Sequence, residues 1–336
     1  MALPAAAARP AGIALGVLAD ALFADPRRGH PVAGFGRAAS ALERRWYADD
    51  VGRGALFTGV AVGVPVALGV LAERATARRP LARAAVTAAA TWAVLGGTSL
   101  AREGTAMAGL LEAGARPGGD LTGARRRLSH LCARDPSQLT ADELARATVE
   151  SLAENASDAV VAPLLWGAVA GVPGLLGYRA VNTLDAMVGY RSARYERFGR
   201  VPARLDDGVN LVPARVCGAL VSLAAPTVGG STARAWRTMR RDGGRHPSPN
   251  AGRPEAAAAG ALAVSLGGRN TYPGYVEDRP ALGDGHPPRV ADVHRAVRLG
   301  RAVTVTATAL AVGVAWAGAG AGAGVAATAR RSRRRA

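Results

Sequence analysis

Long stretches of uncharged, mostly apolar residues recur along the 336-residue chain and alternate with polar, arginine-rich segments. Each stretch is at least 18 residues long, about the length that a helix needs to cross the hydrocarbon core of a bilayer. Because backbone groups in lipid must pair within their own segment, such stretches form helices. The pattern therefore predicts an all-α, multi-pass integral membrane protein. The stretches are residues 54–72, 84–101, 159–178, 216–233 and 302–329.

Two of these stretches are expected to be re-entrant or interrupted. Residues 159–178 contain Pro163 and a Gly-Val-Pro-Gly sequence at 171–174, and both features permit a break in a membrane helix. Residues 216–233 contain Pro226 and a Gly-Gly pair, so this segment is not predicted to be a simple span. The chain would then cross the membrane fewer times than a count of its apolar stretches suggests.

The first hundred residues predict a short helix followed by a helical hairpin. Residues 1–30 look like a signal peptide, but Asp20 interrupts the apolar run. We therefore expect a short, partly buried helix whose Asp20 and Asp25 face the protein interior. Residues 54–72 and 84–101 are predicted to pair as a hairpin across an arginine-rich turn.

Two polar regions, residues 102–158 and 234–301, are expected to lie in the cytoplasm within a single membrane domain that covers residues 1–336. The first is predicted to be helical, with a capping box formed by Thr140 and Glu143. The second is rich in Pro and Gly and is predicted to be rich in loops. Its segment from residue 246 to 255 predicts either a rigid turn that presents polar groups or a plain surface loop.

The net charge of +17 comes from arginine alone, because the chain contains no lysine. A lysine-dependent phosphate loop and a Schiff base are therefore excluded. The arginines are scattered through nearly every loop without one basic face, which argues against nucleic-acid binding. Lipid headgroups and phosphorylated substrates suit them better. Cys132 and Cys217 lie too far apart in sequence for a cysteine-based zinc site and indicate no disulfide framework.

A row of acidic residues precedes the central apolar stretch. Glu150, Glu154 and Asp158 are four residues apart, so a helix would stack them on one face. Like charges at this spacing destabilise a helix by a few tenths of a kcal/mol per pair. The row is either a well-solvated acidic face or a site that holds Mg²⁺ or arginine.

A second polar cluster follows the central stretch. Asn182 and Asp185 fall on one helical face. Arg204, Asp206, Asp207 and Asn210 follow a Gly- and Pro-containing turn, which indicates a junction between a loop and a helix. Adjacent carboxylates beside an asparagine suit an oxygen-ligand Mg²⁺ site. The alternative is that one of the two aspartates caps the helix.

Taken in order, these segments resemble the CobD/CbiB family of cobalamin biosynthesis, whose members are adenosylcobinamide-phosphate synthases. The resemblance is carried by five blocks in a shared order between about residues 15 and 285. They are LADALFADP with HPV, ESLAENASDAVVAPLL, YRAVNTLDAMVGY, FGRVPARLDDGVNLVPAR, and HPSPNAGRPEAAAAGALAVSLGG with TYPG.

The resemblance implies a multi-pass enzyme of the cell membrane. It implies ATP-driven amide-bond formation between adenosylcobyric acid and (R)-1-aminopropan-2-ol or its O-phosphate, giving adenosylcobinamide or its phosphate. Other corrinoid-pathway enzymes are candidate partners. The alternative is a membrane transporter or corrinoid-binding scaffold without ligase activity, in which Asp and Asn residues would line a solute path.

The chemistry of this reaction suggests roles for the polar residues. Phosphoryl transfer needs Mg²⁺ and fixed positive charge, and the attacking amine must lose a proton. We expect the Glu154 and Asp206 clusters to meet in one cavity. The candidate metal ligands are Glu154, Asp206 and Asp207, and the candidate phosphate-binding residues are Arg204 and Arg215. The candidate bases that accept the proton of the amine are Asp158 and Asp185. The candidate residues that bind amide and carboxylate oxygens of the substrate are Asn155, Asn182, Asn210, Ser248 and Asn250.

Overall fold

The computed structural model describes residues 3–26, 28–190, 192–272 and 275–333. It confirms an all-α, multi-pass membrane protein. Within the described residues, six helical runs are long and apolar enough to cross a bilayer. Each of the predicted apolar stretches lies largely within one of these runs, and the sixth run is the N-terminal helix. The runs are Ala5–Phe23, Val51–Thr76, Pro80–Gly114, Ala141–Gly189, Arg200–Val228 and Val290–Gly320.

The chain folds into two compact units, each made of segments that are far apart in sequence. Unit 1 consists of Met1–Leu95, Pro163–Asp206 and Ala307–Ala336. Unit 2 consists of Gly96–Ala162 and Asp207–Thr306. The cytoplasmic placement of residues 102–158 and 234–301 stays a prediction.

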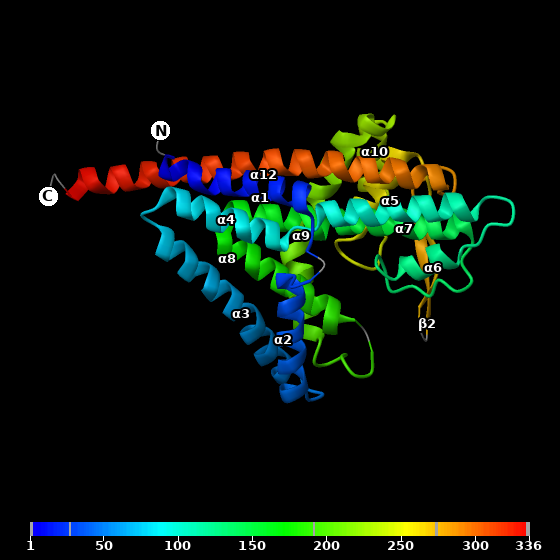
Figure 1. Cartoon of the computed structure of the whole chain (residues 1–336), viewed down its shortest axis with the longest axis horizontal. Helices are drawn as coiled ribbons and strands as arrows, with labels where there is room; N and C mark the ends of the chain where they lie inside the picture. The colour runs from blue at the N-terminus through cyan, green and yellow to red at the C-terminus, as the bar shows by residue number, and fades with distance from the viewer. Residues whose placement is uncertain (1–2, 27, 191, 273–274, 334–336) are drawn as a thin grey trace. The chain divides into compact units, whose positions relative to one another are not determined.

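In unit 1, the N-terminal helix α1 (Ala8–Phe23) packs along α4 (Pro80–Val94) (Figure 1). The close approach depends on Gly12 and Gly16, which lie one turn apart on α1. A Cβ atom on Gly12 would lie only 2.5 Å from the Cβ atom of Thr87 on α4. Small residues at this spacing let two membrane helices pack backbone to backbone. The carboxylate of Asp20 is buried, as predicted, with 2% of the residue exposed.

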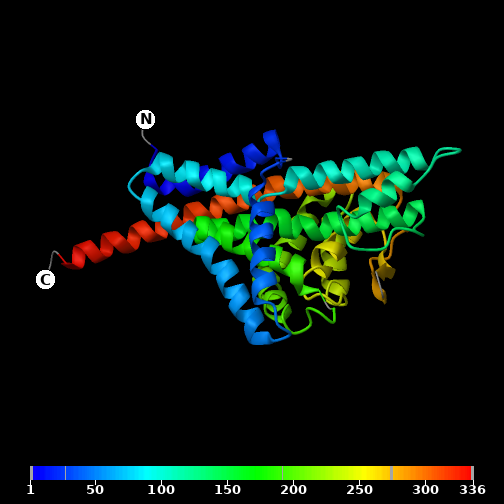
Figure 2. The ribbon, with the colours of Figure 1, turned by 60° about the horizontal axis from the view of Figure 1, so that its bottom comes forward.

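The predicted hairpin is formed by α3 (Val51–Thr76) and α4, which splay apart from a short turn (Figures 1 and 2). Its second helix is shorter than the apolar stretch at 84–101. The backbone of Leu95 is extended, and a new helix, α5 (Gly97–Gly114), starts two residues later in unit 2. The prediction of one continuous helix there was wrong, because Gly96 and Gly97 permit a break that hydropathy does not reveal.

The central stretch reverses direction within α8 (Ala162–Leu184), as the Gly-Val-Pro-Gly sequence predicted. Gly171 has φ 66° and ψ −147°, a conformation open essentially to glycine alone. A Cβ atom on Gly167 would lie 2.7 Å from Leu175 Cδ2, although eight residues of a straight helix would separate these positions by about 12 Å. The two legs therefore fold back on each other, and the segment is a helical hairpin.

Charged side chains satisfy the backbone groups that the reversal leaves free. Glu73 Oε1 accepts a hydrogen bond from the Val172 N–H at 3.1 Å, at the start of the second leg. Arg9 Nη1 donates to the carbonyl oxygens of Ala168 and Val169, at 3.3 and 3.2 Å, at the end of the first leg. The signs of the two charges also match the helix ends that they contact.

We expect Gly171→Ala to destabilise the protein by about 1–3 kcal/mol, because alanine disfavours this backbone conformation. Its Cβ atom would also collide with the Glu73 carboxylate. Gly59→Ala on α3 is the matched control, since no heavy atom lies within 4 Å of its new methyl group. Thermal unfolding in detergent measures both variants. Equal midpoints for the two variants would contradict the assigned reversal.

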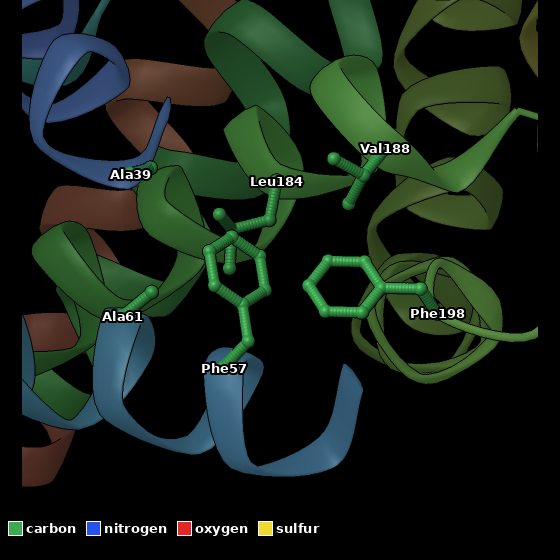
Figure 3. Close-up of a cluster of buried hydrophobic side chains, with 6 residues drawn as sticks. All are labelled: Ala39, Phe57, Ala61, Leu184, Val188 and Phe198. Atoms are coloured by element: carbon green, nitrogen blue, oxygen red, sulfur yellow. The ribbon is translucent and has the colours of Figure 1, made fainter. Parts of the chain in front are cut away.

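A compact apolar cluster closes the end of unit 1 that includes α2 (Pro31–Trp46) (Figure 3). The rings of Phe57 and Phe198 are in contact at a tilt of 38°, with centroids 5.1 Å apart. Neither residue is exposed to solvent. Their neighbours in the cluster are Ala39, Ala61, Leu184 and Val188.

Unit 2 is built around α7 (Ala141–Ala156), which packs on α5 (Figure 1). The predicted capping box starts this helix, because Thr140 and Glu143 each accept a hydrogen bond from the backbone N–H of the other. A π-helical turn, Ser157–Val161, follows it. The other helices that contribute to unit 2 are α6 (Thr122–Leu128), α9 (Arg200–Ala224), α10 (Thr232–Asp242), α11 (Gly252–Leu262) and α12 (Val290–Arg333).

The region from residue 234 to 301 is more ordered than predicted. Its alanine-rich helix α11 is buried along its length and packs on α10. It also contains an antiparallel hairpin of β1 (Leu266–Tyr272) and β2 (Tyr275–Leu282), drawn in orange in Figure 2. The bulge at Gly267 and Gly268, both with positive φ, interrupts the alternation that would have indicated a strand.

Candidate functional site

The predicted site residues are divided between the two units. The prediction that the Glu154 and Asp206 clusters share one cavity therefore stays a prediction, and each group is described within its own unit. Unit 1 contains Asn182, Asp185, Arg204 and Asp206, and unit 2 contains Glu154, Asn155, Asp158, Asp207, Asn210, Arg215, Ser248 and Asn250.

In unit 1, Asn182 connects an arginine and an aspartate. Arg179 Nη1 donates to Asn182 Oδ1 at 3.2 Å, and Asn182 Nδ2 reaches Asp206 Oδ1 at 3.5 Å. Arg179 also donates to the carbonyl oxygen of Val94. Asp185 begins a π-helical turn, Asp185–Gly189, that ends the second leg of α8. Arg179 was missed from the sequence because one arginine among so many carries no signal.

Asp206 and Asp207 lie inside α9 rather than at its start. The helix begins at Arg200, so both residues are in its second turn and neither caps it. The alternative of a helix cap was wrong. Neighbouring residues of a helix also point in different directions and do not face each other. The two carboxylates therefore do not converge on one ion as an adjacent pair would in a loop.

In unit 2, Glu150 is buried, with 1% of the residue exposed. Its carboxylate lies 2.5 Å from Arg134 Nη2 and accepts a hydrogen bond from the Gly267 N–H at 2.6 Å. Arg146 Nη1 is 3.8 Å away. The prediction of a well-solvated acidic face was thus wrong for Glu150. The alternative, that the carboxylate holds an arginine, is confirmed for this residue.

The rest of the acidic row behaves differently. Glu154, one turn further along α7, is partly exposed. The π-helical turn contains one residue more than an α-helical turn. Asp158 is therefore displaced from the helix face that it would share with Glu150 and Glu154 on a regular α-helix. Asn155 Nδ2 donates to the Ser151 carbonyl oxygen at 2.8 Å on its own helix.

The segment before α11 is a hydrogen-bonded turn rather than a plain surface loop, with His246, Asn250 and Ala251 buried and Pro247 and Pro249 exposed. Ser248 Oγ accepts hydrogen bonds from the N–H groups of Asn250 and Ala251, at 3.3 and 3.2 Å. Asn250 Nδ2 donates to the Asp207 carbonyl oxygen at 2.8 Å, which ties the turn to α9. Asn250 Oδ1 is buried without a hydrogen-bond partner.

Glu255 and His246 are both buried at this turn. Glu255 is 1% exposed, and neither of its carboxylate oxygens has a hydrogen-bond partner in the described part of the chain. His246 Nδ1 accepts from the Ser248 N–H at 3.0 Å, so the neutral ring carries its proton on Nε2. That Nε2 atom lies 3.8 Å from Glu255 Oε1 and, within residues 3–26, 28–190, 192–272 and 275–333, also has no hydrogen-bond partner.

Charged groups of α7, the segment before it and the β-hairpin act on these two residues. Burial, then the charges of Glu154 and Glu150, raise the pKa of Glu255 well above its usual value, against the opposing effect of Arg279 and Arg134. Burial and the nearby Arg279 lower the pKa of His246 to about 4. We call this group the buried polar cluster: Arg134, Glu150, Glu154, His246, Glu255 and Arg279.

Most of the buried polar cluster was missed from the sequence. His246 and Glu255 lie in the same short segment as the predicted Ser248 and Asn250. Their burial depends on the turn that leads into α11, which begins at Gly252, and this turn was not predicted in detail. The role of Arg279 depends on the β-hairpin, which was not predicted. The available signal was a histidine and a glutamate flanking a polar Pro- and Gly-rich turn.

Within the described residues, no group of three or more His, Cys, Asp or Glu side chains is placed to hold a metal ion. The predicted ligands therefore do not form a complete protein site for Mg²⁺. They fit Mg²⁺ only as a partial set, because this ion is usually held by one or two carboxylates together with substrate phosphates. Asp207, whose residue is exposed on α9, is available for such a role.

Comparison with known proteins identifies the relatives of the chain. The model of a family described as CobD/Cbib protein matches residues 13–300. "Cobalamin biosynthesis protein CobD" of Mycobacterium tuberculosis is 54% identical over 296 residues, which cover 88% of this chain and 92% of that protein. The protein of the same name from Geobacter metallireducens is 46% identical and covers 84% of this chain and 89% of its own. No solved structure matches the chain.

Proposed function

The chain belongs to the CobD/CbiB family of cobalamin biosynthesis proteins, and on this premise we propose that it catalyses ATP-dependent amide-bond formation. The bond would join adenosylcobyric acid to (R)-1-aminopropan-2-ol or its O-phosphate and give adenosylcobinamide or its phosphate. The observation that carries the proposal is the buried polar cluster, with unpartnered donor and acceptor atoms inside a chain of this family. We place the protein in the cell membrane because six helical runs of its described residues are long and apolar enough to cross a bilayer.

The reaction needs two steps. A carboxylate oxygen of the corrin substrate attacks the terminal phosphorus of ATP, forming an acyl phosphate and releasing ADP. The amine nitrogen then attacks the acyl carbon, the phosphate group leaves, and the nitrogen loses its extra proton to a base. The carboxylates of Asp158 and Asp185 are candidate bases, and the amide groups of Asn155, Asn182, Asn210 and Asn250 are candidates for orienting substrate oxygens.

The residues of α9 are proposed to bind the phosphates. Arg204 and Arg215 are both exposed, and Arg215 Nη1 donates to the Leu211 carbonyl oxygen at 2.7 Å on its own helix. Guanidinium groups suit phosphate oxygens because they donate two parallel hydrogen bonds. Asp207 would hold Mg²⁺ together with phosphate oxygens, and the ion would neutralise charge that develops on them.

We expect Arg204→Gln and Arg215→Gln each to raise the KM for ATP or the phosphorylated amine, or to lower kcat, at least tenfold. A hydrogen bond between charged groups contributes about 1.5–3 kcal/mol, which corresponds to roughly a ten- to hundredfold effect. Arg200→Gln, an exposed arginine in the first turn of the same helix, is the control. Assays in neutral detergent and in liposomes separate phosphate binding from lipid attraction. Equal losses in all three variants would remove the phosphate role.

Complementation tests the proposed function. The gene is introduced into a strain that lacks the amide-forming step, and the cells are fed either cobyric acid or cobinamide. A synthase is required only with cobyric acid, because cobinamide already contains the amide bond. Equal dependence on the protein under both feeds would indicate transport and would overturn the proposal.

A further inference from the structure

We propose that Glu255 and His246 form the recognition site for the amine substrate, which they bind as a vicinal amino alcohol or its phosphate ester. Glu255 takes the primary ammonium group, and the Nε2–H group of His246 donates to the neighbouring oxygen. This inference rests on the proposed amide-forming function, for which it names the residues that select the amine.

The first observation is that unpartnered polar atoms are concentrated at this place. Buried side chains are normally paired, so each exception in a native protein calls for an explanation such as a ligand. Both oxygens of Glu255, His246 Nε2 and Asn250 Oδ1 are buried without hydrogen-bond partners among the residues that the structure describes. Neither Glu255 nor His246 is more than 9% exposed. The pair thus offers one donor and several acceptors that the protein itself leaves unused.

The second observation is the balance of charge around the pair. Four acidic side chains face three guanidinium groups there, so one negative charge is uncompensated when His246 is neutral and all four acids, Glu255 included, are ionised. A single positive charge on a ligand would neutralise it, and burying an uncompensated charge is costly. The carboxylates are Glu150, Glu154, Glu255 and Glu277, and the guanidinium groups are Arg134, Arg146 and Arg279.

The third observation concerns the kind of cation. A metal ion would need several ligands converging on one point, and none of the described His, Cys, Asp and Glu side chains form such a set. An ammonium group instead carries three N–H donors, which suit the free oxygens of Glu255 and Asn250. The 3.8 Å gap between Glu255 Oε1 and His246 Nε2 leaves an acceptor and a donor side by side. A vicinal amino alcohol presents the complementary pair.

The neighbourhood also predicts how binding depends on pH. The raised pKa of Glu255 means that its carboxylate form increases as pH rises above the usual range of a glutamate. Affinity for the ammonium group should therefore increase as pH rises above the usual titration range of a glutamate, as long as the amine itself stays protonated. The buried polar cluster reaches solvent at one edge. Glu277, whose side chain is 30% exposed, and the partly exposed Glu154 lie at this edge.

Binding to the full-length protein in detergent tests the proposal. Isothermal titration compares three probes: 1-aminopropan-2-ol, propylamine, which lacks the oxygen, and propane-1,2-diol, which lacks the amine. Wild-type protein is expected to bind the amino alcohol most tightly. Glu255→Gln keeps the shape of the side chain but removes its charge, and it should weaken amino-alcohol binding roughly ten- to hundredfold.

His246→Asn provides a second, independent variant. The asparagine oxygen can still accept from the Ser248 N–H, but the donor that faces Glu255 is lost. This variant should bind amino alcohol and propylamine equally, whereas wild-type protein should prefer the amino alcohol. Glu112→Gln is the matched control, because Glu112 and His294 form a Glu–His pair at 2.7 Å whose side chains are 53% and 45% exposed. It should leave all three affinities unchanged.

Two outcomes would overturn the inference, and a third would separate it from the proposed function. Wild-type affinity in folded Glu255→Gln would mean that Glu255 is only a buried neutral acid, and the proposed amide synthesis would still stand. Retained preference for the amino alcohol in His246→Asn would remove His246 from the site. If instead Glu255-dependent binding is found in a protein that fails the feeding test, the amine site stands and the amide-forming function falls.

Discussion

Replacing Arg134 with methionine is expected to destabilise the protein by about 3–5 kcal/mol, the cost of leaving one partner of a buried ion pair uncompensated. Arg134 and Glu150 have side chains that are 6% and 1% exposed, and their charged atoms are 2.5 Å apart. Without Arg134, the carboxylate keeps only the Gly267 N–H and Arg146, whose nearest nitrogen is 3.8 Å away. The β-hairpin should loosen first, because Glu150 binds its bulge.

The double variant Arg134→Met/Glu150→Gln should recover most of this loss, because no charge is then left unpaired. Unfolding in detergent, followed by circular dichroism, measures both proteins. Arg197→Met is the control: its ion pair with Asp49 is 4.0 Å long and more than half exposed on each side, so its loss should cost about 1 kcal/mol or less. A single variant as stable as this control would contradict the assigned role of Arg134.

Phe198→Ala is expected to have an effect of similar size in unit 1. Phe198 is fully buried and packs against Phe57 and Tyr47, with ring centroids 5.1 and 5.3 Å away. Removing a buried phenylalanine ring typically costs about 3–5 kcal/mol, because the cavity refills only in part. Figure 3 shows the ring beside that of Phe57 and near Val188, so both lose a packing partner.

Leu68→Ala on α3 is the control for this variant, because Leu68 is 58% exposed on the surface of the protein. It should change the unfolding midpoint little in detergent. If Phe198→Ala unfolded at the same temperature as Leu68→Ala, the apolar cluster around Phe57 and Phe198 would not be the packing centre of unit 1.

Hydropathy predicted the spanning helices because membrane crossing depends on length and apolar character, which are local properties. The reversal of the central stretch was also predictable, since only glycine adopts the backbone angles of Gly171 and the sequence places proline two residues later. The capping box of Thr140 and Glu143 is local in the same sense. The break at Leu95 was missed because Gly96 and Gly97 carry no charge and do not end the apolar stretch, although a Gly-Gly pair also marks the interruption predicted within residues 216–233.

The candidate site was predicted less well, because its polar contacts join residues that are far apart in sequence. Glu150 meets Arg134 and Gly267, and no sequence spacing relates the three. The pairing of His246 with Glu255 requires the turn before α11 to fold inward. Asp206 and Asp207 look like a chelating pair in sequence, but a helix directs neighbouring side chains apart.

The most direct test of amide synthesis uses purified protein, adenosylcobyric acid, ATP and an amine substrate labelled with ¹⁵N, followed by mass spectrometry of the corrinoid product. The account predicts a product that contains one labelled nitrogen per corrinoid and that forms only when ATP is present. Recovery of unchanged adenosylcobyric acid, with all of the label left in the free amine, would contradict it.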